Sequence, residues 1–376
     1  MQANAFQQSL PEIMARSIIS RHSKYLDKWC YELGLILKSL EAVWRLTGKQ
    51  EYFNYIKVTV DRFVDKSGNI SGYDNNELNL DMVNPGKALL LLHNETADSR
   101  YKKAADTLRE QLNRQPRNRQ GGFWHKALYP HQMWLDGVYM SSPFYAQYAS
   151  IFGDSEAFDD IVNQVTLLAE NAKDPATGLL YHAWDESKGM KWADDKTGCS
   201  PHFWGRAMGW YAMALTDILD FFPNTHPKRE EIADILKALM TSLIKAQDKE
   251  TGLWYQVVNL GERKGNYHEA SASCMFTYSY ARSVNKGYLE SSFKETAVKA
   301  YEGILEHLTY IDESGCLNLK NVCSVAGVGG NPYRDGSFEY YISEPVVEND
   351  YKGYGPLVLA AVEMDQLGGS SLYDKP

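Results

Sequence analysis

Apolar side chains recur every three or four residues in one segment of the chain after another, which is the spacing of amphipathic α-helices. Six such stripes span residues 33–44, 101–112, 158–168, 208–219, 232–243 and 298–308. Alternating runs of the kind that form half-buried strands are rare and short. The pattern predicts a nearly all-helical protein whose loops are marked by Gly, Asn, Asp and Pro.

The predicted loops share a signature in which polar residues precede a glycine and an aromatic or aliphatic residue follows it. The marker glycines are Gly68, Gly122, Gly178, Gly252 and Gly315. They are 54, 56, 74 and 63 residues apart and 61 residues follow the last one, so the chain divides into about six units. A unit of about 62 residues holds two helices of roughly 15 residues each, and each pair needs neighbours to bury its apolar face.

Six helix pairs can stack as an open solenoid or close into a double-layered barrel. A solenoid needs polar terminal caps, whereas the last unit here contains the apolar run 355–362. We therefore expect one closed, all-α barrel over residues 1–376, with its loops gathered on the rim that carries the site. The alternative is that glycine-rich turns between helices recur by chance.

The charge and hydropathy of the chain argue against nucleic acid and membranes as partners. The net charge is −9, no basic block occurs, and no apolar run approaches the length of a membrane span. We expect neither nucleic acid nor a membrane as partner. The five cysteines show no metal-ligand spacing and are expected to be reduced. Residues 1–20 lack the apolar core of a signal peptide, which predicts a cytoplasmic protein, or a periplasmic one if a leader has been removed.

The chain is rich in aromatic residues, and the densest polar and aromatic cluster spans residues 122–144. It contains Lys126, His131, Trp134, Asp136 and Tyr139. A carboxyl group among so many rings would be partly desolvated, which favours its neutral form and suits it to donate a proton near neutral pH. The alternative is that Asp136 only caps the helix that follows.

Further polar candidates lie in other loops. Asp81 is a second carboxylate, with helix capping again the alternative. His182, Trp204 and Arg206 lie between the third and fourth units. An indole ring stacks on the apolar face of a sugar, and an arginine binds a carboxylate with two hydrogen bonds. These residue types together are typical of a site for an acidic carbohydrate.

Other chemistries find little support. The chain contains no G-x-S-x-G, Walker, H-E-x-x-H or dinucleotide-binding motif. His125 and His131 are six residues apart and could be metal ligands, but polar loop lining is the better interpretation. We therefore predict no metal site.

Four segments together resemble the unsaturated rhamnogalacturonyl hydrolases of glycoside hydrolase family 105. They are Asn79-Leu-Asp-Met-Val-Asn-Pro-Gly-Lys87, Met133-Trp-Leu-Asp-Gly-Val-Tyr-Met140, Tyr181-His-Ala-Trp-Asp185 and Phe203-Trp-Gly-Arg-Ala-Met-Gly-Trp210. Segments 270–278, 285–288 and 348–355 also look like that family, so the resemblance runs along nearly the whole chain.

The resemblance implies an (α/α)6 barrel, in agreement with the six-unit count. It also implies removal of a 4,5-unsaturated galacturonyl residue from the non-reducing end of pectin-derived oligosaccharides, without a cofactor. The substrate carries an enol ether across C4 and C5. Protonation at C4 and addition of water at C5 give a hemiketal that opens and releases the neighbouring sugar.

The resemblance also assigns roles to residues. Asp136 matches the aspartate that protonates C4 and then deprotonates the incoming water, and Asp81 matches the second aspartate of the site. The remaining predicted substrate-binding residues are Trp134, His182, Trp204, Arg206, Lys126, Met140 and His131. Ring stacking and carboxylate recognition are the tasks expected of the tryptophans and Arg206.

Two alternatives remain open at this point. The related unsaturated glucuronyl hydrolases share the fold and the hydration reaction but act on fragments of glycosaminoglycans. A barrel without catalytic activity that binds a sugar or a protein belongs to a different class. The expected partner is an unsaturated uronic-acid oligosaccharide, with no obligate protein partner.

Overall fold

The structure is a computed structural model that describes residues 9–21 and 24–368. Residues 1–8, which belong to the segment expected to contain no leader, lie outside the described residues. The α-helices are α1 (Leu10–Arg21), α2 (Tyr31–Thr47), α3 (Gln50–Asp61), α4 (Gly86–Thr96), α5 (Ser99–Arg114), α6 (Leu135–Phe152), α7 (Glu156–Asn171), α8 (Gly205–Phe221), α9 (Arg229–Ala246), α10 (Ala270–Asn285), α11 (Lys294–Gly303), α12 (Phe338–Ser343) and α13 (Tyr351–Gln366). Short helical turns are η1 (Lys24–Asp27), η2 (Leu80–Met82), η3 (Ser291–Phe293) and η4 (Ile304–Leu308).

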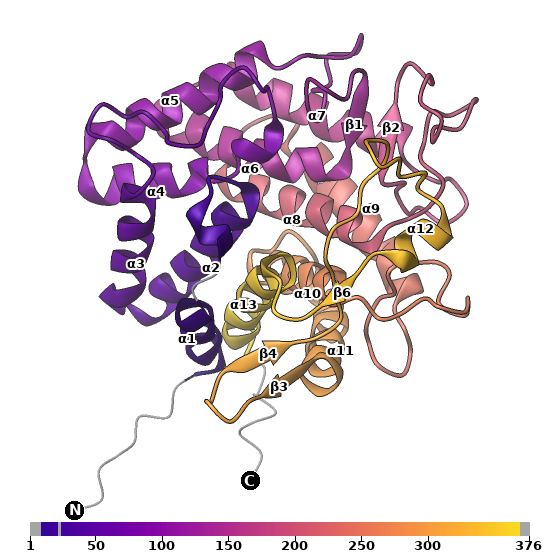
Figure 1. Cartoon of the computed structure of the whole chain (residues 1–376). Coiled ribbons are helices and arrows are strands. Elements are labelled where there is room, and N and C mark those ends of the chain that lie inside the picture. Colours follow the sequence, from indigo (N-terminus) through magenta and orange to yellow (C-terminus); the bar gives the residue numbers. More distant parts are fainter. Residues whose placement is uncertain (1–8, 22–23, 369–376) are drawn as a thin grey trace, which may run out of the picture.

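The described helices form two concentric rings (Figure 1). In the inner ring α2, α4, α6, α8, α10 and α13 pack each against the next, and α13 packs against both α10 and α2, which closes the ring. The outer helices α3, α5, α7, α9 and α11 each pack against the inner helix that precedes them, while α1 packs against α13. The predicted (α/α)6 barrel is therefore confirmed. Its sixth helix pair consists of α1 and α13, which come from opposite ends of the described chain.

Close packing between inner helices depends on small residues at their contacts. A Cβ atom on Gly209 of α8 would lie 2.7 Å from Met275 Sδ of α10. A Cβ atom on Gly355 of α13 would lie 2.7 Å from Leu35 Cγ of α2. Such distances are below van der Waals contact, so glycine lets these helices approach each other more closely than any larger residue would.

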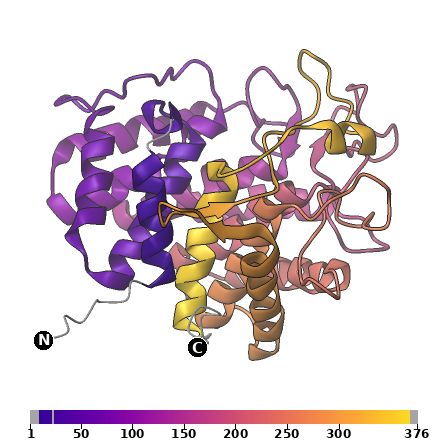
Figure 2. The same ribbon diagram turned by 60° about the horizontal axis from the view of Figure 1, so that its bottom comes forward.

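The five marker glycines lie in the connections that lead from an outer helix to the next inner helix, or from α11 towards α13. In each of these loops an Asp or Asn side chain accepts hydrogen bonds from backbone N–H groups a few residues further on. The recurring sequence signature is thus a local turn in which the side chain satisfies the backbone. In Figure 2, long loops gather along the upper edge of the molecule, above the upright helices α11 and α13.

Three short antiparallel ribbons tie the loops together. They are β1 (Gln132–Trp134) with β2 (Ala183–Asp185), β3 (Thr309–Ile311) with β4 (Leu317–Leu319), and β5 (Val322–Cys323) with β6 (Val346–Val347). Single bridges pair Asn79 with Lys126 and Trp204 with Val257. β3 and β4 form a local hairpin, whereas the pairing of β1 with β2 and the two single bridges join segments about 50 residues apart in the sequence. Within the described residues, no helix has both the length and the apolar character needed to cross a bilayer.

Candidate active site

A cavity opens at the N-terminal ends of the inner helices. Its lining includes Tyr31 at the start of α2, Asp136 in the first turn of α6, Arg206 in the first turn of α8 and Lys352 in the first turn of α13. The complete lining is Tyr31, Asp81, His125, Lys126, Tyr129, Trp134, Asp136, Met140, Trp204, Arg206, Trp210, Val325, Ala326, Arg334 and Lys352. The N-terminus of a helix carries a partial positive charge, so the barrel directs a field that favours anions into this cavity.

Asp136 is placed by the ribbon that joins β1 to β2. The Leu135 N–H donates to the carbonyl oxygen of His182 at 3.1 Å, and this leaves His182 Nε2 3.2 Å from Asp136 Oδ2. On its other side, His182 Nδ1 lies 2.8 Å from the hydroxyl oxygen of Tyr341. Because the N-cap position of α6 is Trp134, the interpretation of Asp136 as a helix cap is wrong. Its carboxyl group instead faces the cavity beside a buried imidazole.

Asp81 is held as a carboxylate by two basic neighbours. The pairing of residue 79 with residue 126 places Lys126 Nζ 2.6 Å and His125 Nε2 3.5 Å from the Asp81 carboxylate. Burial, the largest single influence, would raise the pKa of Asp81, but the charge and hydrogen bond of Lys126 together with His125 outweigh it and the pKa is lowered. The pKa of Lys126 is raised by the same pair, against the effect of its own burial. Asp81 lies in η2, before α4, so it does not cap that helix.

His125 completes this group as a neutral imidazole. Its burial lowers its pKa to about 4, although the charge of Asp81 acts in the opposite direction. Its ring stacks on Trp134, with ring centroids 4.7 Å apart and an interplanar angle of 9°. The sequence favoured polar loop lining over metal binding for His125, and the structure places it in the cavity lining.

The two predicted tryptophans line the cavity but are packed among other rings. Trp134 stacks on His125 and also on Tyr129, whose ring centroid is 5.2 Å away at an interplanar angle of 12°. Trp134 also lies in the cavity lining, and the sugar stacking expected of it stays a prediction. Trp204 is 1% exposed, stacks on Tyr341 and donates its indole N–H to Gln256 Oε1. Its large buried ring contributes to packing as well as to the cavity wall.

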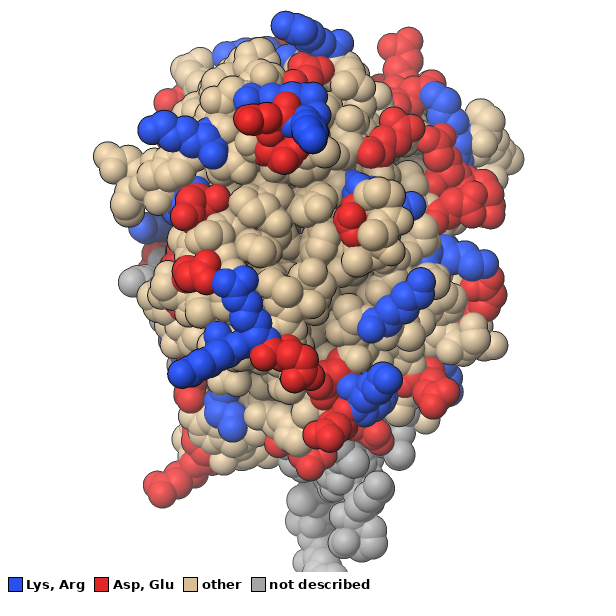
Figure 3. Space-filling model, turned by 90° about the vertical axis from the view of Figure 1, so that its right-hand side faces the viewer, with Lys and Arg blue, Asp and Glu red and all other residues tan. Residues whose placement is uncertain are grey.

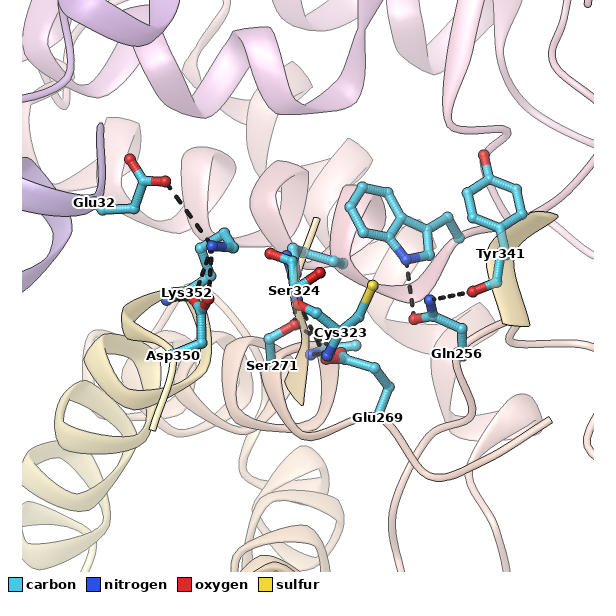
Figure 4. Close-up of polar contacts among 12 residues, drawn as sticks. Glu32, Gln256, Glu269, Ser271, Cys323, Ser324, Tyr341, Asp350 and Lys352 are labelled. Carbon is cyan, nitrogen blue, oxygen red and sulfur yellow. Dashed lines mark hydrogen bonds and ion pairs between the residues drawn. The ribbon is translucent and has the colours of Figure 1, made fainter. Parts of the chain in front are cut away.

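Arg206 is bound by groups of the protein itself. Its Nε donates to Ser271 Oγ at 2.7 Å and its Nη2 donates to the Cys323 carbonyl oxygen and lies 3.5 Å from Glu269 Oε1. Burial, the largest single influence, would lower the pKa of Arg206, but Glu269 and further nearby groups, among them Asp350, together outweigh it and the pKa is raised. Figure 4 shows Glu269 beside Ser271 and Cys323, and Lys352 between Asp350 and Glu32.

The remaining predicted residues differ in their placement. Met140 lies in the cavity lining. His131 does not. It has a left-handed backbone φ of 65° and its ring packs against Trp124, outside the residues that line the cavity. The predicted role of His131 as a lining residue is thus not supported by the geometry.

Several residues of the site were not singled out in the sequence. Arg334 comes from a glycine-rich loop with no periodic pattern, and Glu269 gave no signal beyond its position before a helix. Lys352 lies within the segment 348–355 that resembles the family, so a motif comparison alone could have found it. On the face shown in Figure 3, acidic and basic side chains are interspersed around an uncharged centre.

A family model and two similar proteins relate the chain to a group of glycoside hydrolases. Residues 7–367 match the family model described as Glycosyl Hydrolase Family 88. A solved structure described as a glycoside hydrolase from family 105 of C. acetobutylicum ATCC 824 is 47% identical, with a TM-score of 0.94 over 96% of this chain and 100% of that one. The unsaturated rhamnogalacturonyl hydrolase YesR of Bacillus subtilis strain 168 is 28% identical over 68% of this chain and 71% of its own.

A more distant solved structure is an unsaturated glucuronyl hydrolase of Bacillus sp. GL1, responsible for the degradation of glycosaminoglycan. It is 13% identical, with a TM-score of 0.67 over 96% of this chain and 95% of that one. At this level of identity the likeness shows the fold alone.

Proposed function

The chain belongs to glycosyl hydrolase family 88 and to glycoside hydrolase family 105, and on that premise we propose that this glycosidase removes a 4,5-unsaturated galacturonyl residue from the non-reducing end of rhamnogalacturonan-derived oligosaccharides. The support is the pairing of a cavity suited to an anion with one carboxyl group, that of Asp136, which is placed for proton transfer. The cytoplasmic location and the lack of an obligate protein partner stay predictions.

The electrostatics of the cavity suit an anionic sugar. Four basic side chains, Lys126, Arg206, Arg334 and Lys352, line the cavity. The N-terminal ends of the inner helices add partial positive charge at the same end of the barrel. A uronic acid carries one carboxylate on C5 and would be attracted to this field, whereas a neutral hexose would gain nothing from it.

The proposed reaction needs one group that first gives and then takes a proton. Asp136 donates a proton to C4, and positive charge develops at C5 and the ring oxygen. A water molecule adds at C5 and returns a proton to Asp136, which gives a hemiketal. The C5–O bond of the ring then breaks to a ketone, and the hemiacetal left at C1 collapses to an aldehyde and releases the neighbouring sugar. The atoms balance, because one water molecule is consumed for each glycosidic bond that is cleaved.

His182 is a positioning residue for Asp136 in this scheme. Its Nε2 lies 3.2 Å from Asp136 Oδ2, and its Nδ1 is fixed by Tyr341. Asp81 also has an imidazole neighbour, His125 Nε2 at 3.5 Å, but it is paired in addition with the ammonium group of Lys126. Asp185 binds its own loop through Ser187 and Met190. The observation that carries the proposal is therefore the contact between Asp136 and His182 at the cavity wall.

The first experiment replaces Asp136 by Asn, which keeps the shape of the side chain and removes its acidic proton. Loss of a general acid costs roughly 100- to 10,000-fold in rate, so kcat should fall at least about 100-fold. The melting temperature should stay unchanged. The assay follows the ultraviolet absorbance of the C4–C5 double bond, which disappears on hydration. Asp195→Asn, at an exposed position of the loop between β2 and α8, is the matched control. Substantial activity in Asp136→Asn would show that another group is the acid.

The same assay decides the substrate. Unsaturated galacturonyl-rhamnose should lose its absorbance quickly, and an unsaturated chondroitin disaccharide should not. Faster consumption of the chondroitin disaccharide would make the protein an unsaturated glucuronyl hydrolase instead. If neither compound were consumed, the catalytic proposal would fail in favour of a sugar-binding barrel.

A further inference from the structure

The four basic residues of the cavity differ in whether the protein already neutralises them. Lys126 is paired with Asp81, Arg206 with Glu269, and Lys352 with Asp350 and Glu32. Among the described residues, no carboxylate lies within ion-pair distance of Arg334, which is half-buried at the cavity. The charge of one guanidinium in the lining is therefore available to a ligand.

The guanidinium of Arg334 is held in place by neutral acceptors. Its Nε donates to the Gly329 carbonyl oxygen at 2.9 Å, and its Nη2 lies 3.3 Å from both the Val328 carbonyl oxygen and the Tyr129 hydroxyl oxygen. Tyr129 in turn stacks on Trp134. These bonds fix the side chain without cancelling its charge, and a fixed arginine loses little conformational freedom when it binds a carboxylate.

The loop around Arg334 leaves no room for larger residues. A Cβ atom on Gly327 would lie 2.4 Å from Arg334 Nη1, and one on Gly330 would lie 3.1 Å from its Nη2. The glycines of the segment 327–330 thus let the backbone wrap the guanidinium closely. The tight fit holds the group at the cavity wall that also carries Tyr129 and Trp134.

We propose that Arg334 binds the carboxylate of the unsaturated uronyl residue and so sets the preference of the site for an acidic sugar. The identity of that sugar rests on the proposed function. The carboxylate is attached to C5, next to the C4 atom that Asp136 protonates, so a group that holds the carboxylate also fixes the double bond relative to the acid. This assignment replaces the role that the sequence predicted for Arg206, whose guanidinium is taken up by Glu269, Ser271 and Cys323.

The experiment measures binding separately from turnover. Calorimetry follows unsaturated galacturonyl-rhamnose binding to Asp136→Asn alone and combined with Arg334→Gln, Arg334→Lys or Arg229→Gln. Arg229 is the matched control, because it also donates to backbone carbonyl oxygens, those of Leu219 and Phe222, but lies outside the cavity lining. A charge-assisted hydrogen bond contributes enough that Arg334→Gln should weaken binding about 10- to 100-fold. Arg334→Lys should restore part of the affinity, and Arg229→Gln should change it less than about twofold.

A second ligand isolates the carboxylate. The methyl ester of the same disaccharide has no negative charge on its uronyl residue, so Arg334→Gln should weaken its binding about twofold or less. Equal losses for acid and ester, unchanged affinity of Arg334→Gln for the acid, or no binding of the acid by the Asp136→Asn parent would each overturn the proposal. If the wild-type protein binds the acid through Arg334 but does not hydrate it, the proposed function fails while the carboxylate site stands.

Discussion

Tyr341 links α12 to the acid through His182. Its hydroxyl oxygen lies 2.8 Å from His182 Nδ1, and burial raises the pKa of Tyr341 well above its ordinary value, so the phenol stays neutral. A neutral phenol can donate to Nδ1 or accept from it, and in either case the hydrogen bond orients the His182 ring beside Asp136. We therefore regard Tyr341 as a positioning residue that acts through His182.

Replacement of Tyr341 by Phe removes only the hydroxyl group. One hydrogen bond is worth about 1 kcal/mol, so kcat should fall roughly fivefold, the pH profile of kcat should shift, and KM should change less than about twofold. Tyr310→Phe, on the exposed ribbon β3–β4, is the control. A rise in KM with kcat and its pH profile unchanged would contradict the positioning role.

Gly355 allows α13 to lie against α2 and so closes the inner ring. In an isolated helix, Ala in place of Gly stabilises by about 1 kcal/mol, but here the new Cβ would lie 2.7 Å from Leu35 Cγ. Overpacking of this kind costs about 1 to 3 kcal/mol. Gly355→Ala should therefore lower the free energy of unfolding by about 1 kcal/mol, measured by denaturant titration. Asn54→Ala, at an exposed position of α3, should change it by less than about 0.5 kcal/mol. A more stable Gly355→Ala variant would show that the two helices move apart without cost.

The helices that the sequence predicts best belong mainly to the outer ring. α5, α7 and α9 each have one apolar face and one exposed face, so their apolar stripes have helical spacing. α10 and α13 are buried on nearly all sides and contain Ser, Gly and Ala at their contacts, which erases the stripe. The pairing of α1 with α13 could not be predicted from the spacing of the marker glycines, because the two helices lie at opposite ends of the described chain.

The candidate site follows from the sequence only as far as local motifs reach. The loops that contain Asp81, Asp136 and Trp204 were identified by their residue types and by family resemblance, and the structure brings all three to one cavity. The sequence could not predict which arginine, Arg206 or Arg334, is available to bind a carboxylate of the substrate. The answer depends on Glu269, which lies 63 residues from Arg206 in the sequence, and on the absence of a described carboxylate near Arg334.

The opposite end of the barrel holds a second cavity whose lining contains a buried lysine, Lys87. This cavity of about 600 Å³ opens at the C-terminal ends of the inner helices, and Lys87 of α4 lies in its lining. Lys38 is paired there with Asp217, and Arg282 with Asp220 and Glu363. The ammonium group of Lys87 is buried without a hydrogen-bond partner among the described residues and lies 4.3 Å from the centre of the Tyr139 ring. Lys87 is thus a buried ammonium group to which no described acidic residue forms a hydrogen bond.

This burial makes the stability of the whole protein depend on pH. Burial first, and the charge of Lys38 second, lower the pKa of Lys87 from 10.5 to about 7. Between pH 7 and pH 10.5 the unfolded chain therefore binds a proton that the folded protein does not, and the contribution of Lys87 to stability rises with pH, by at most about 1.4 kcal/mol per pH unit.

Lys87→Met, which fills the same space without a charge, should be more stable than the wild type at pH 7. The difference should shrink as the pH rises towards 10, because the neutral amine no longer carries the cost of a buried charge. Denaturant titrations of both proteins at pH 7, 8, 9 and 10 measure this difference, and common titrations of other groups cancel in it. Lys286→Met, at an exposed position beyond α10, should give curves parallel to those of the wild type. Parallel curves for Lys87→Met as well would mean that Lys87 keeps its ordinary pKa in the folded protein.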